Sequence, residues 1–356
     1  MRYIDLSKKQ PKKTSSRKRR AWPKFLVVGG VLGLGSLFLL RHTFSLAGLL
    51  RPISAFSQIV NPRKIQSTDG RTNVLLLALD RRKTFDPNCG GGGGSLTDTI
   101  ILASLDLEEK DAVLISIPRD LWVETGYFSG KINSAFVVGE RNGRGAEFAS
   151  RIVEGVTGVP VHYYVVVDFS GFKKAIDILG GIEVEVERAF DDYKYPIAGK
   201  ECTEPEEERW KQIHFDQGLQ TMDGERALEF VRSRRAMGRE GSDFARSRRQ
   251  QKVLIAMRGK TLSFGGFSDF SRVKELYETY KEYVETNLSL SEIQGFLGVM
   301  PEVENFCSEV LGGETGLFTS SGDSEEFNGA WVLIPRAGDF SEVRAYVNDL
   351  LFGSGK

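Results

Sequence analysis

An uncharged apolar segment near the N-terminus, residues 25–40, constrains this chain more than any other feature of its sequence. Its sixteen residues, FLVVGGVLGLGSLFLL, follow a basic run, and the apolar stretch continues past Arg41 to Leu50. A spanning helix needs about 20 apolar residues, and an arginine near its end can extend its side chain to the membrane interface. We therefore predict a transmembrane signal anchor over residues 25–50. A cleaved signal peptide and a buried core helix are the alternatives.

The distribution of charge predicts the orientation of this anchor. Residues 1–24 hold ten basic residues and one acidic residue, whereas the rest of the chain holds 38 basic and 47 acidic residues. Because basic flanks stay in the cytoplasm, we expect a single-pass protein of the cell membrane with residues 1–24 inside. The following domain is then extracytoplasmic, on the periplasmic or cell-wall side. Topology and anionic lipids explain the basic tail, so we predict no nucleic-acid partner.

The remaining sequence predicts one α/β domain. Residues 51–70 contain two prolines and are expected to form a linker to a domain over residues 71–356. The continuous apolar run at 72–80 is typical of a strand buried on both faces, and two β-rich runs follow around a charged turn. Strands and helices then alternate, which favours a three-layer α/β/α sandwich around a central mixed sheet. The later expected elements are helices at 131–140 and 145–156, a strand at 161–168, a helix at 169–181, a strand at 182–187, a surface loop at 191–217, helices at 221–235, 243–260 and 271–300, and a final strand and helix within 331–353.

Cysteine and histidine usage excludes several classes of enzyme. The chain has three cysteines and three histidines, and none of them cluster, so no Cys/His zinc site is expected. Neither His-Glu-x-x-His nor Gly-x-Ser-x-Gly occurs, which excludes a zinc peptidase and a serine hydrolase with a nucleophile elbow. The chemistry therefore depends on carboxylates and arginines, with or without a hard metal. Cys202 and Cys307 could pair in an oxidising exterior, but spacing does not decide this.

Three charged residues lie at predicted strand ends. Asp80 closes the first strand, Asp98 begins the second, and Arg119 follows the third. Ligands of α/β folds bind at strand ends along one edge of the sheet. Two carboxylates there could share Mg²⁺, with Mn²⁺ as an alternative, because Mg²⁺ accepts few protein ligands beside water and phosphate. The other interpretation is that both aspartates only cap a turn.

A dense group of basic residues follows in this otherwise acidic domain. Asp243 begins a predicted helix, and Arg246 and Gln250 follow about one and two turns later on the same face. A run of charged residues usually forms a solvent-exposed helix face, yet the concentration of arginines here favours anion binding. Arginine binds phosphate through planar paired donors and stays charged, so this group predicts a pyrophosphate site. The nine basic residues are Arg226, Arg232, Arg234, Arg235, Arg239, Arg246, Arg248, Arg249 and Lys252.

Taken together, these motifs resemble those of the LytR-CpsA-Psr family. They are, in order, NVLLLALD with Arg82, TDTIIL, ISIPRDLWV, KIN, VDFSGF, GGIEVEV, DGERALEFVRSRR and D-x-x-R-x-x-RQQ, between residues 73 and 260. The resemblance implies an extracytoplasmic, membrane-anchored phosphotransferase with an α/β/α fold and an apolar tunnel for a prenyl chain. Such enzymes move a glycopolymer from a polyprenyl-pyrophosphate carrier to peptidoglycan and form a phosphodiester with Mg²⁺.

The resemblance also implies roles for individual residues. Asp80 and Asp98 match the metal-binding aspartates. Asp243 matches a polar residue that orients the arginines and is a candidate base for the incoming hydroxyl; Arg119 and Arg246 are the other expected catalytic residues. The expected pyrophosphate-binding residues are Arg82, Arg119, Arg232, Arg234, Arg246 and Gln250.

One segment departs from the family pattern. Members usually carry an arginine in the loop just before the second aspartate, whereas this chain has CGGGGGSLTD, with Leu96 two residues before Asp98. Arg81 or Arg82 could replace the missing charge, and no Walker lysine follows the glycines. Two alternatives stay open. One is a pyrophosphatase that passes the phosphate to water, and the other, suggested by this departure, is a non-catalytic protein that binds lipid carriers or wall polymers.

Overall fold

The computed structural model describes residues 65–80, 96–200, 203–263, 282–312, 315–321, 325–327 and 329–353. The predicted cytoplasmic tail, the anchor and most of the linker lie outside these segments, as do Arg82, Cys202 and the glycine run. The fold below is that of the compact unit within Gln58–Lys356. Within the described segments, no helix combines the length and the apolar character that crossing a membrane requires.

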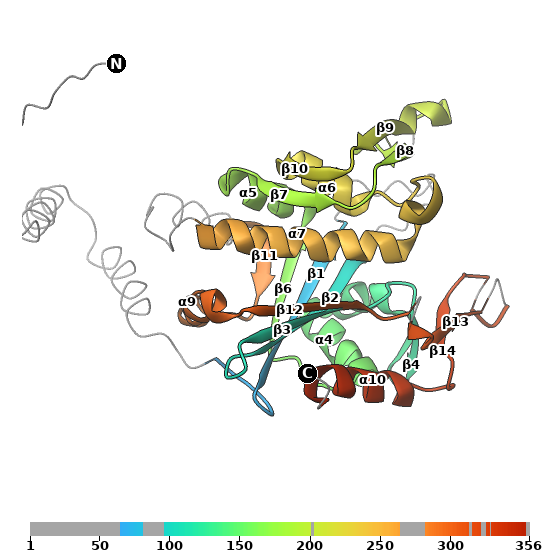
Figure 1. Cartoon of the computed structure of the whole chain (residues 1–356). Coiled ribbons are helices and arrows are strands. Elements are labelled where there is room, and N and C mark those ends of the chain that lie inside the picture. The colour runs from blue at the N-terminus through green and yellow to red at the C-terminus, as the bar shows by residue number, and fades with distance from the viewer. Residues whose placement is uncertain are drawn as a thin grey trace, which may run out of the picture. The chain divides into compact units, whose positions relative to one another are not determined.

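A six-stranded mixed sheet forms the centre of the domain (Figure 1). The strand order is β11-β6-β1-β2-β3-β12. β1 pairs parallel with β6 and antiparallel with β2, and β3 pairs antiparallel with β2 and parallel with β12. The predicted mixed α/β fold with a central mixed sheet is therefore confirmed. The strands are β1 (Arg71–Leu79), β2 (Thr97–Asp106), β3 (Asp111–Ser116), β6 (Tyr163–Asp168), β11 (Val284–Thr286) and β12 (Asn305–Val310).

Both faces of this sheet are covered by helices. Leu75, Leu77 and Leu79 of β1 pack with α4 (Gly145–Thr157) and α10 (Ser341–Phe352) in one core. The alternate side chains of β1 and β2 face α7 (Asp243–Ser263) and α9 (Leu290–Val299). In Figure 1, α4 and α10 lie on the opposite side of the sheet from α7. Burial on both sides explains the continuous apolar run of β1.

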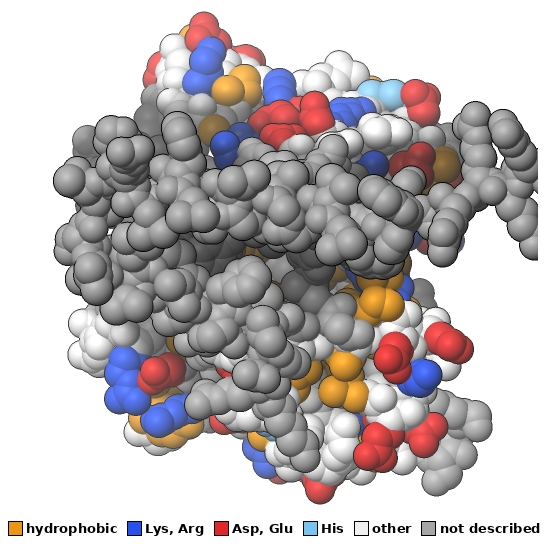
Figure 2. Space-filling model, turned by 90° about the vertical axis from the view of Figure 1, so that its left-hand side faces the viewer, with side chains coloured by type: hydrophobic (Ala, Val, Ile, Leu, Met, Phe, Trp, Pro, Cys, Tyr) orange, Lys and Arg blue, Asp and Glu red, His pale blue; other side chains and the backbone are white. Residues whose placement is uncertain are grey.

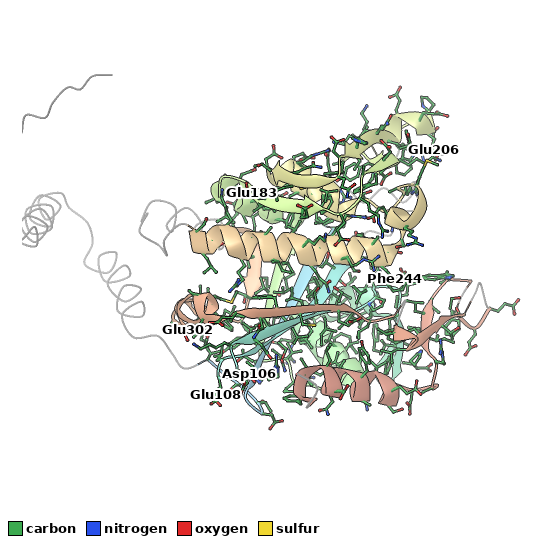
Figure 3. The ribbon with its side chains drawn as sticks, in the orientation of Figure 1. Asp106, Glu108, Glu183, Glu206, Phe244 and Glu302 are labelled. Carbon is green, nitrogen blue, oxygen red and sulfur yellow. The ribbon has the colours of Figure 1, made fainter. Side chains whose placement is uncertain are left out.

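A second group of elements packs against α7 around its own core. β7 (Ile182–Val186) pairs with β10 (Gly218–Met222), and β8 (Phe190–Pro196) pairs with β9 (Trp210–Phe215). These strands, α5 (Phe169–Ile178) and α6 (Gly224–Arg232) enclose a core that includes three mutually packed phenylalanine rings. Glu183 and Glu206, on β7 and on the short helix η3 (Glu206–Arg209), mark the outer side of this group in Figure 3.

Two sequence predictions need correction. The surface loop expected over 191–217 is wrong, because this segment contains the β8–β9 hairpin; a register shift between Asp192 and Tyr195 interrupts the alternation that would reveal a strand. The long helix expected over 271–300 is also wrong in its described part, where β11 is followed by α9. Ser289 begins α9 with a capping box formed with Glu292, a local signal for a new helix start.

The remaining elements agree with the predicted alternation, except that the helix expected over 221–235 is limited to α6, because Thr221 and Met222 belong to β10 and the helix ends at Arg232. The helices expected at 131–140 and 145–156 and the final strand and helix are confirmed. Cys307 lies exposed on β12, and its pairing with Cys202 stays a prediction. The other elements are β4 (Trp122–Thr125), β5 (Phe128–Lys131), η2 (Ile132–Ser134), α3 (Ala135–Glu140), η4 (Gly238–Gly241), η5 (Met300–Glu302), β13 (Phe318–Ser320), η7 (Glu325–Phe327) and β14 (Leu333–Pro335).

Asp223 caps α6, the helix that ends at Arg232. Its carboxylate accepts a hydrogen bond from the backbone N–H of Arg226 at 2.8 Å. We expect Asp223→Ala to lower the free energy of unfolding by about 1 kcal/mol, because the cap satisfies a helix-end donor and complements the helix dipole. Asp223→Asn retains an acceptor oxygen, so its free energy of unfolding should fall much less. Urea unfolding followed by circular dichroism compares the two variants, and equal losses would contradict a capping role.

Candidate functional site

A cavity of about 1050 Å³ runs along the face of the sheet that α7 covers. Its walls come from β1, β2 and β6 on one side and from α5, α6 and α7 on the other. One part is charged and the other apolar. The structure brings seven of the predicted site residues to this single cavity: Asp80, Asp98, Arg119, Arg232, Arg234, Arg246 and Gln250.

Asp98 and Arg119 form the closest ion pair of the charged part. Asp98 lies at the start of β2 and Arg119 follows β3, so the antiparallel pairing of these strands places both at the same edge of the sheet. Arg119 Nη1 donates to Asp98 Oδ1 at 2.6 Å. Burial alone would raise the pKa of Asp98, but the charges of Arg119, Arg246 and Arg234 hold that pKa below its ordinary value. The carboxylate is therefore ionised at neutral pH.

Asp80 and Arg232 form a second, longer ion pair in the charged part of the cavity. Asp80 directly follows β1 and Arg232 is the last residue of α6, and their Oδ2 and Nη2 atoms are 3.7 Å apart. The guanidinium of Arg232 also stacks over the ring of Phe169, at 4.4 Å from the ring centroid. The ring of Tyr195 lies 5.7 Å from the same guanidinium, and these two aromatic contacts orient the arginine at the cavity wall.

One face of α7 supplies three further residues. Arg246 and Gln250 are only 5% and 9% exposed, although they line the cavity, whereas Asp243 is 46% exposed at the beginning of the helix. Asp243 Oδ1 lies 3.0 Å from Arg246 Nη2 and 3.9 Å from Arg119 Nε. Burial and then the charge of Arg119 lower the pKa of Arg246, and Asp243 and Asp98 oppose this effect. The spacing predicted from the sequence thus brings these residues together.

Arg246 retains an unused donor within this cluster. Its Nε is buried and has no hydrogen-bond partner among the described residues. Arg234 is exposed at the cavity. Partial removal of its guanidinium from solvent, and then the charge of Arg119, lower the pKa of Arg234. Closely spaced arginines repel one another and need an anion to complete their hydrogen bonds. The charged part of the cavity can therefore bind a phosphate or pyrophosphate.

Asp80 and Asp98 are the residues that could hold a metal ion. In the described part of the chain, no group of three or more His, Cys, Asp or Glu side chains is arranged around a common metal position. A metal at this edge would have few protein ligands and would need water and phosphate oxygens. Mg²⁺ prefers such a site, so the donor set fits it, although each aspartate is also close to an arginine.

Apolar side chains line the other part of the cavity. Residues of β1 and β6 contribute alternate side chains, as expected for one face of a sheet. The opposite wall comes from α5 and α7. The lining residues include Leu76, Ile101, Val165, Val167, Phe172, Leu254, Met257 and Val284.

Several residues that line the cavity were not predicted from the sequence. Asp192 and Lys194 of β8 lie on the cavity face of that strand, which had been expected to be a loop. Trp122 packs edge-on against Phe327 with 5.0 Å between ring centroids, and no sequence signal connects these two residues. Leu96, the residue in place of the usual arginine, lines the cavity, and its backbone carbonyl accepts a hydrogen bond from the Asp80 N–H at 3.3 Å.

The surface visible in Figure 2 carries basic and acidic side chains in mixed arrangement, with small apolar patches between them. Few large apolar side chains are exposed in the described segments, and the most exposed are Met237, at 73%, and Leu219, at 65%. The apolar lining of the cavity is therefore distinct in character from the outer surface.

Comparisons with known proteins agree with the sequence motifs. The profile of the LytR_cpsA_psr family matches residues 53–335. A protein named polyisoprenyl-teichoic acid–peptidoglycan teichoic acid transferase TagU from Oceanobacillus iheyensis is 28% identical over 346 residues, which cover 93% of this chain and 95% of the relative. The similarly named TagV of Bacillus subtilis is 32% identical over 200 residues, 55% of this chain and 46% of the relative.

The crystal structure of Bacillus subtilis TagV shows the same fold. It superposes with a TM-score of 0.57 at 24% identity and covers 80% of this chain and 98% of the TagV chain. A structure described as TagT bound to LI-WTA gives a TM-score of 0.55 at 23% identity, covering 82% of this chain and 96% of the other. Because both identities are below 25%, these two comparisons show similarity of fold only.

Proposed function

The chain belongs to the LytR_cpsA_psr family, and on that premise we propose that it transfers a glycopolymer phosphate from a polyprenyl-pyrophosphate carrier to peptidoglycan or another cell-wall acceptor, forming a phosphodiester. One observation carries this proposal: a single cavity joins a cluster of arginines to an apolar region. A polyprenyl pyrophosphate has the matching composition, an anionic head and a long apolar chain. The names of the relatives, which describe transfer of teichoic acid to peptidoglycan, support the same reaction class.

The arginine cluster is proposed to bind the pyrophosphate. Arg119, Arg232, Arg234 and Arg246 all line the cavity, and the Nε atoms of Arg119 and Arg246 are buried without a hydrogen-bond partner among the described residues. Gln250, one turn beyond Arg246 on α7, also lines the cavity, and its Nε2 donates to the Val231 carbonyl at 3.5 Å. These groups stay charged or polar in a partly buried site, where they can stabilise negative charge that develops on the transferring phosphate.

A bound Mg²⁺, with Mn²⁺ as an alternative, would be held by Asp80 and Asp98 and would neutralise charge on the phosphate oxygens. The neighbouring arginines keep Asp98 ionised, and the hydrogen bond from Arg119 orients its carboxylate. Arg232 orients Asp80 less closely, at 3.7 Å.

Asp243 is proposed to accept the proton of the attacking hydroxyl. The hydroxyl oxygen of the acceptor attacks the phosphorus that bears the glycan, the bond to the polyprenyl phosphate breaks, and polyprenyl phosphate leaves. The 46% exposure of Asp243 allows an acceptor to approach from solvent, while Arg246 and Arg119 place the carboxylate beside the arginine cluster. An incoming hydroxyl needs such a base within hydrogen-bond reach.

The proposed location is the outer face of the cell membrane, with residues 25–50 as the anchor. This location is supported by the basic residues before the segment, which favour a cytoplasmic N-terminus. A topology reporter fused after Lys356 tests it: activity of an extracytoplasmic reporter is expected, and activity of a cytoplasmic reporter would contradict it.

The reaction is tested by product analysis with the full-length chain in detergent. Incubation with a polyprenyl-pyrophosphate glycan, Mg²⁺ and peptidoglycan should give a glycan–peptidoglycan phosphodiester and polyprenyl phosphate. Free glycan phosphate as the product in the presence of acceptor would favour the pyrophosphatase alternative. Binding of the carrier without turnover under any metal would favour the non-catalytic alternative.

Leu254→Trp tests whether the apolar part of the cavity holds the prenyl chain. Leu254 lines that part, and a larger side chain there fills space that the chain would occupy. We expect binding of a polyprenyl pyrophosphate to weaken by about tenfold or more, while binding of inorganic pyrophosphate is retained. Ile255→Trp is the matched control, because Ile255 follows on the same helix and is 38% exposed. Equal affinity of both variants for the polyprenyl ligand would contradict the assignment.

A further inference from the structure

The end of α6 and the segment after it, which has no regular secondary structure, present three arginines to the cavity. Arg232 is the last residue of α6, and Arg234 and Arg235 follow it before η4. Each backbone N–H in such a connection needs a partner, and a free connection would let the arginine side chains spread over many positions. Two buried charged side chains supply the partners of this segment.

A single buried carboxylate, Asp192, accepts the polar groups of this segment. Its Oδ2 accepts hydrogen bonds from Ser233 Oγ at 2.8 Å, from the Arg234 N–H at 3.3 Å and from the Arg235 N–H at 3.2 Å. Asp192 is 1% exposed and Ser233 is fully buried. Its Oδ1 accepts the N–H of Lys194 in its own strand at 3.0 Å, so both carboxylate oxygens are occupied.

A buried guanidinium, that of Arg249, links this segment to the helices on either side of it, because it binds one carbonyl group in α6, one in the segment and one in η4. Arg249 Nε donates to the Phe230 carbonyl at 2.9 Å, and Nη1 donates to the Glu240 carbonyl at 3.1 Å. Its Nη2 donates to the Ser233 carbonyl. Burial lowers the pKa of Arg249 to about 10, and the nearby Glu240 opposes this effect, so the group is charged at neutral pH. Asp192 therefore binds three donors of the segment, and Arg249 binds the Ser233 carbonyl.

From this arrangement we propose that Asp192 is a positioning residue for the pyrophosphate site, acting through the backbone of Ser233–Arg235. The inference rests on the proposed function, because it assumes that Arg234 binds the pyrophosphate. Asp192 lines the same cavity, but its oxygens are committed to the segment, which separates its role from that of a metal ligand or base. A carboxylate accepts several N–H groups at once, whereas an amide would present one donor group to them.

Amide hydrogen exchange of the full-length chain in detergent tests the first step. In Asp192→Asn, the amides of Arg234 and Arg235 should exchange about tenfold faster or more, because their charged acceptor is lost, while amides of the central sheet keep their protection. Asp191→Asn is the matched control, since Asp191 is the neighbouring residue and pairs with the exposed His214 instead. Unchanged exchange at both arginines in Asp192→Asn would overturn the inference.

Binding of inorganic pyrophosphate tests the second step. We expect about tenfold weaker binding in Asp192→Asn and a smaller loss in Ser233→Ala, which removes only one of the three donors. In an Arg234→Ala background, Asp192→Asn should add less than its effect on the wild type, because the two changes act through the same contact. The same fold-loss in both backgrounds would overturn positioning through Arg234.

The two readouts separate this inference from the proposed function. The exchange measurement requires no ligand, so it decides whether Asp192 holds the segment even if the wild-type chain binds no pyrophosphate. Failure of the wild type to bind pyrophosphate would contradict the proposed function and, with it, the second step. If Asp192→Asn lowered protection throughout the central sheet as much as at Arg234 and Arg235, the result would assign Asp192 to general stability and overturn the proposal.

Discussion

Replacing Asp98 by asparagine is expected to reduce turnover of a polyprenyl-pyrophosphate glycan by about 10³-fold, because the substitution removes charge where the phosphate and its metal are proposed to bind. The variant keeps the shape of the side chain but loses the ionised carboxylate that Arg119 contacts at 2.6 Å. Turnover is measured at saturating Mg²⁺ with the full-length chain. The loss should appear in kcat as well as in kcat/KM, since the group acts on the reacting phosphate.

Asp106→Asn is the control for this prediction. Asp106 lies at the other end of the same strand, β2, where it pairs with Arg71 at 3.7 Å, and Figure 3 shows it at the edge of the sheet away from Phe244 of α7. Its replacement removes the same charge from the same strand without touching the cavity. Turnover of Asp106→Asn should stay within a factor of two to three of wild type, whereas a loss comparable to that of Asp98→Asn would contradict a local role for Asp98.

Replacing Arg246 by alanine should reduce turnover by about 10²- to 10³-fold, because a buried donor group is removed from the side of the phosphate. The change also leaves Asp243 without its closest cation, at 3.0 Å, so the proposed base is less well held. Arg246→Lys restores the charge but not the planar pair of donors, and we expect it to recover only part of the activity.

Arg248→Ala is the matched control for Arg246, because it lies two residues further on the same helix and is exposed. It should retain activity near the wild-type level. Equal activity of Arg246→Ala and Arg248→Ala would exclude the proposed role. Full recovery in Arg246→Lys would show that charge alone, without bidentate geometry, is sufficient.

The charged part of the cavity could be anticipated from the sequence because its residues follow simple geometric rules. Asp80 and Asp98 lie at strand ends, which meet at one edge of the sheet. Asp243, Arg246 and Gln250 share a helix face through their spacing. Both rules depend only on local periodicity, and periodicity can be read directly from the chain.

Other parts of the site depend on contacts that no local pattern reveals. Asp192 lies in a strand whose alternation is broken by a register shift, so the segment resembles a loop. Phe327 meets Trp122 across about 200 residues of sequence, and only the folded chain brings these rings together. The apolar part of the cavity likewise arises from side chains on six separate elements, and the sequence pattern of each element is equally compatible with a filled core.

The backbone hydrogen bond from Asp80 to Leu96 has a consequence for how this site can change in evolution. The bond closes the base of the connection between the two carboxylates, at 3.3 Å, and β1 and β2 are paired along their length beneath it. The distance between the two carboxylate positions is therefore determined by strand pairing and is independent of the length or composition of residues 81–95. Natural variants or engineered chimaeras that change this connection are therefore expected to keep the backbone positions of Asp80 and Asp98, although they would also change Arg82, an expected pyrophosphate-binding residue.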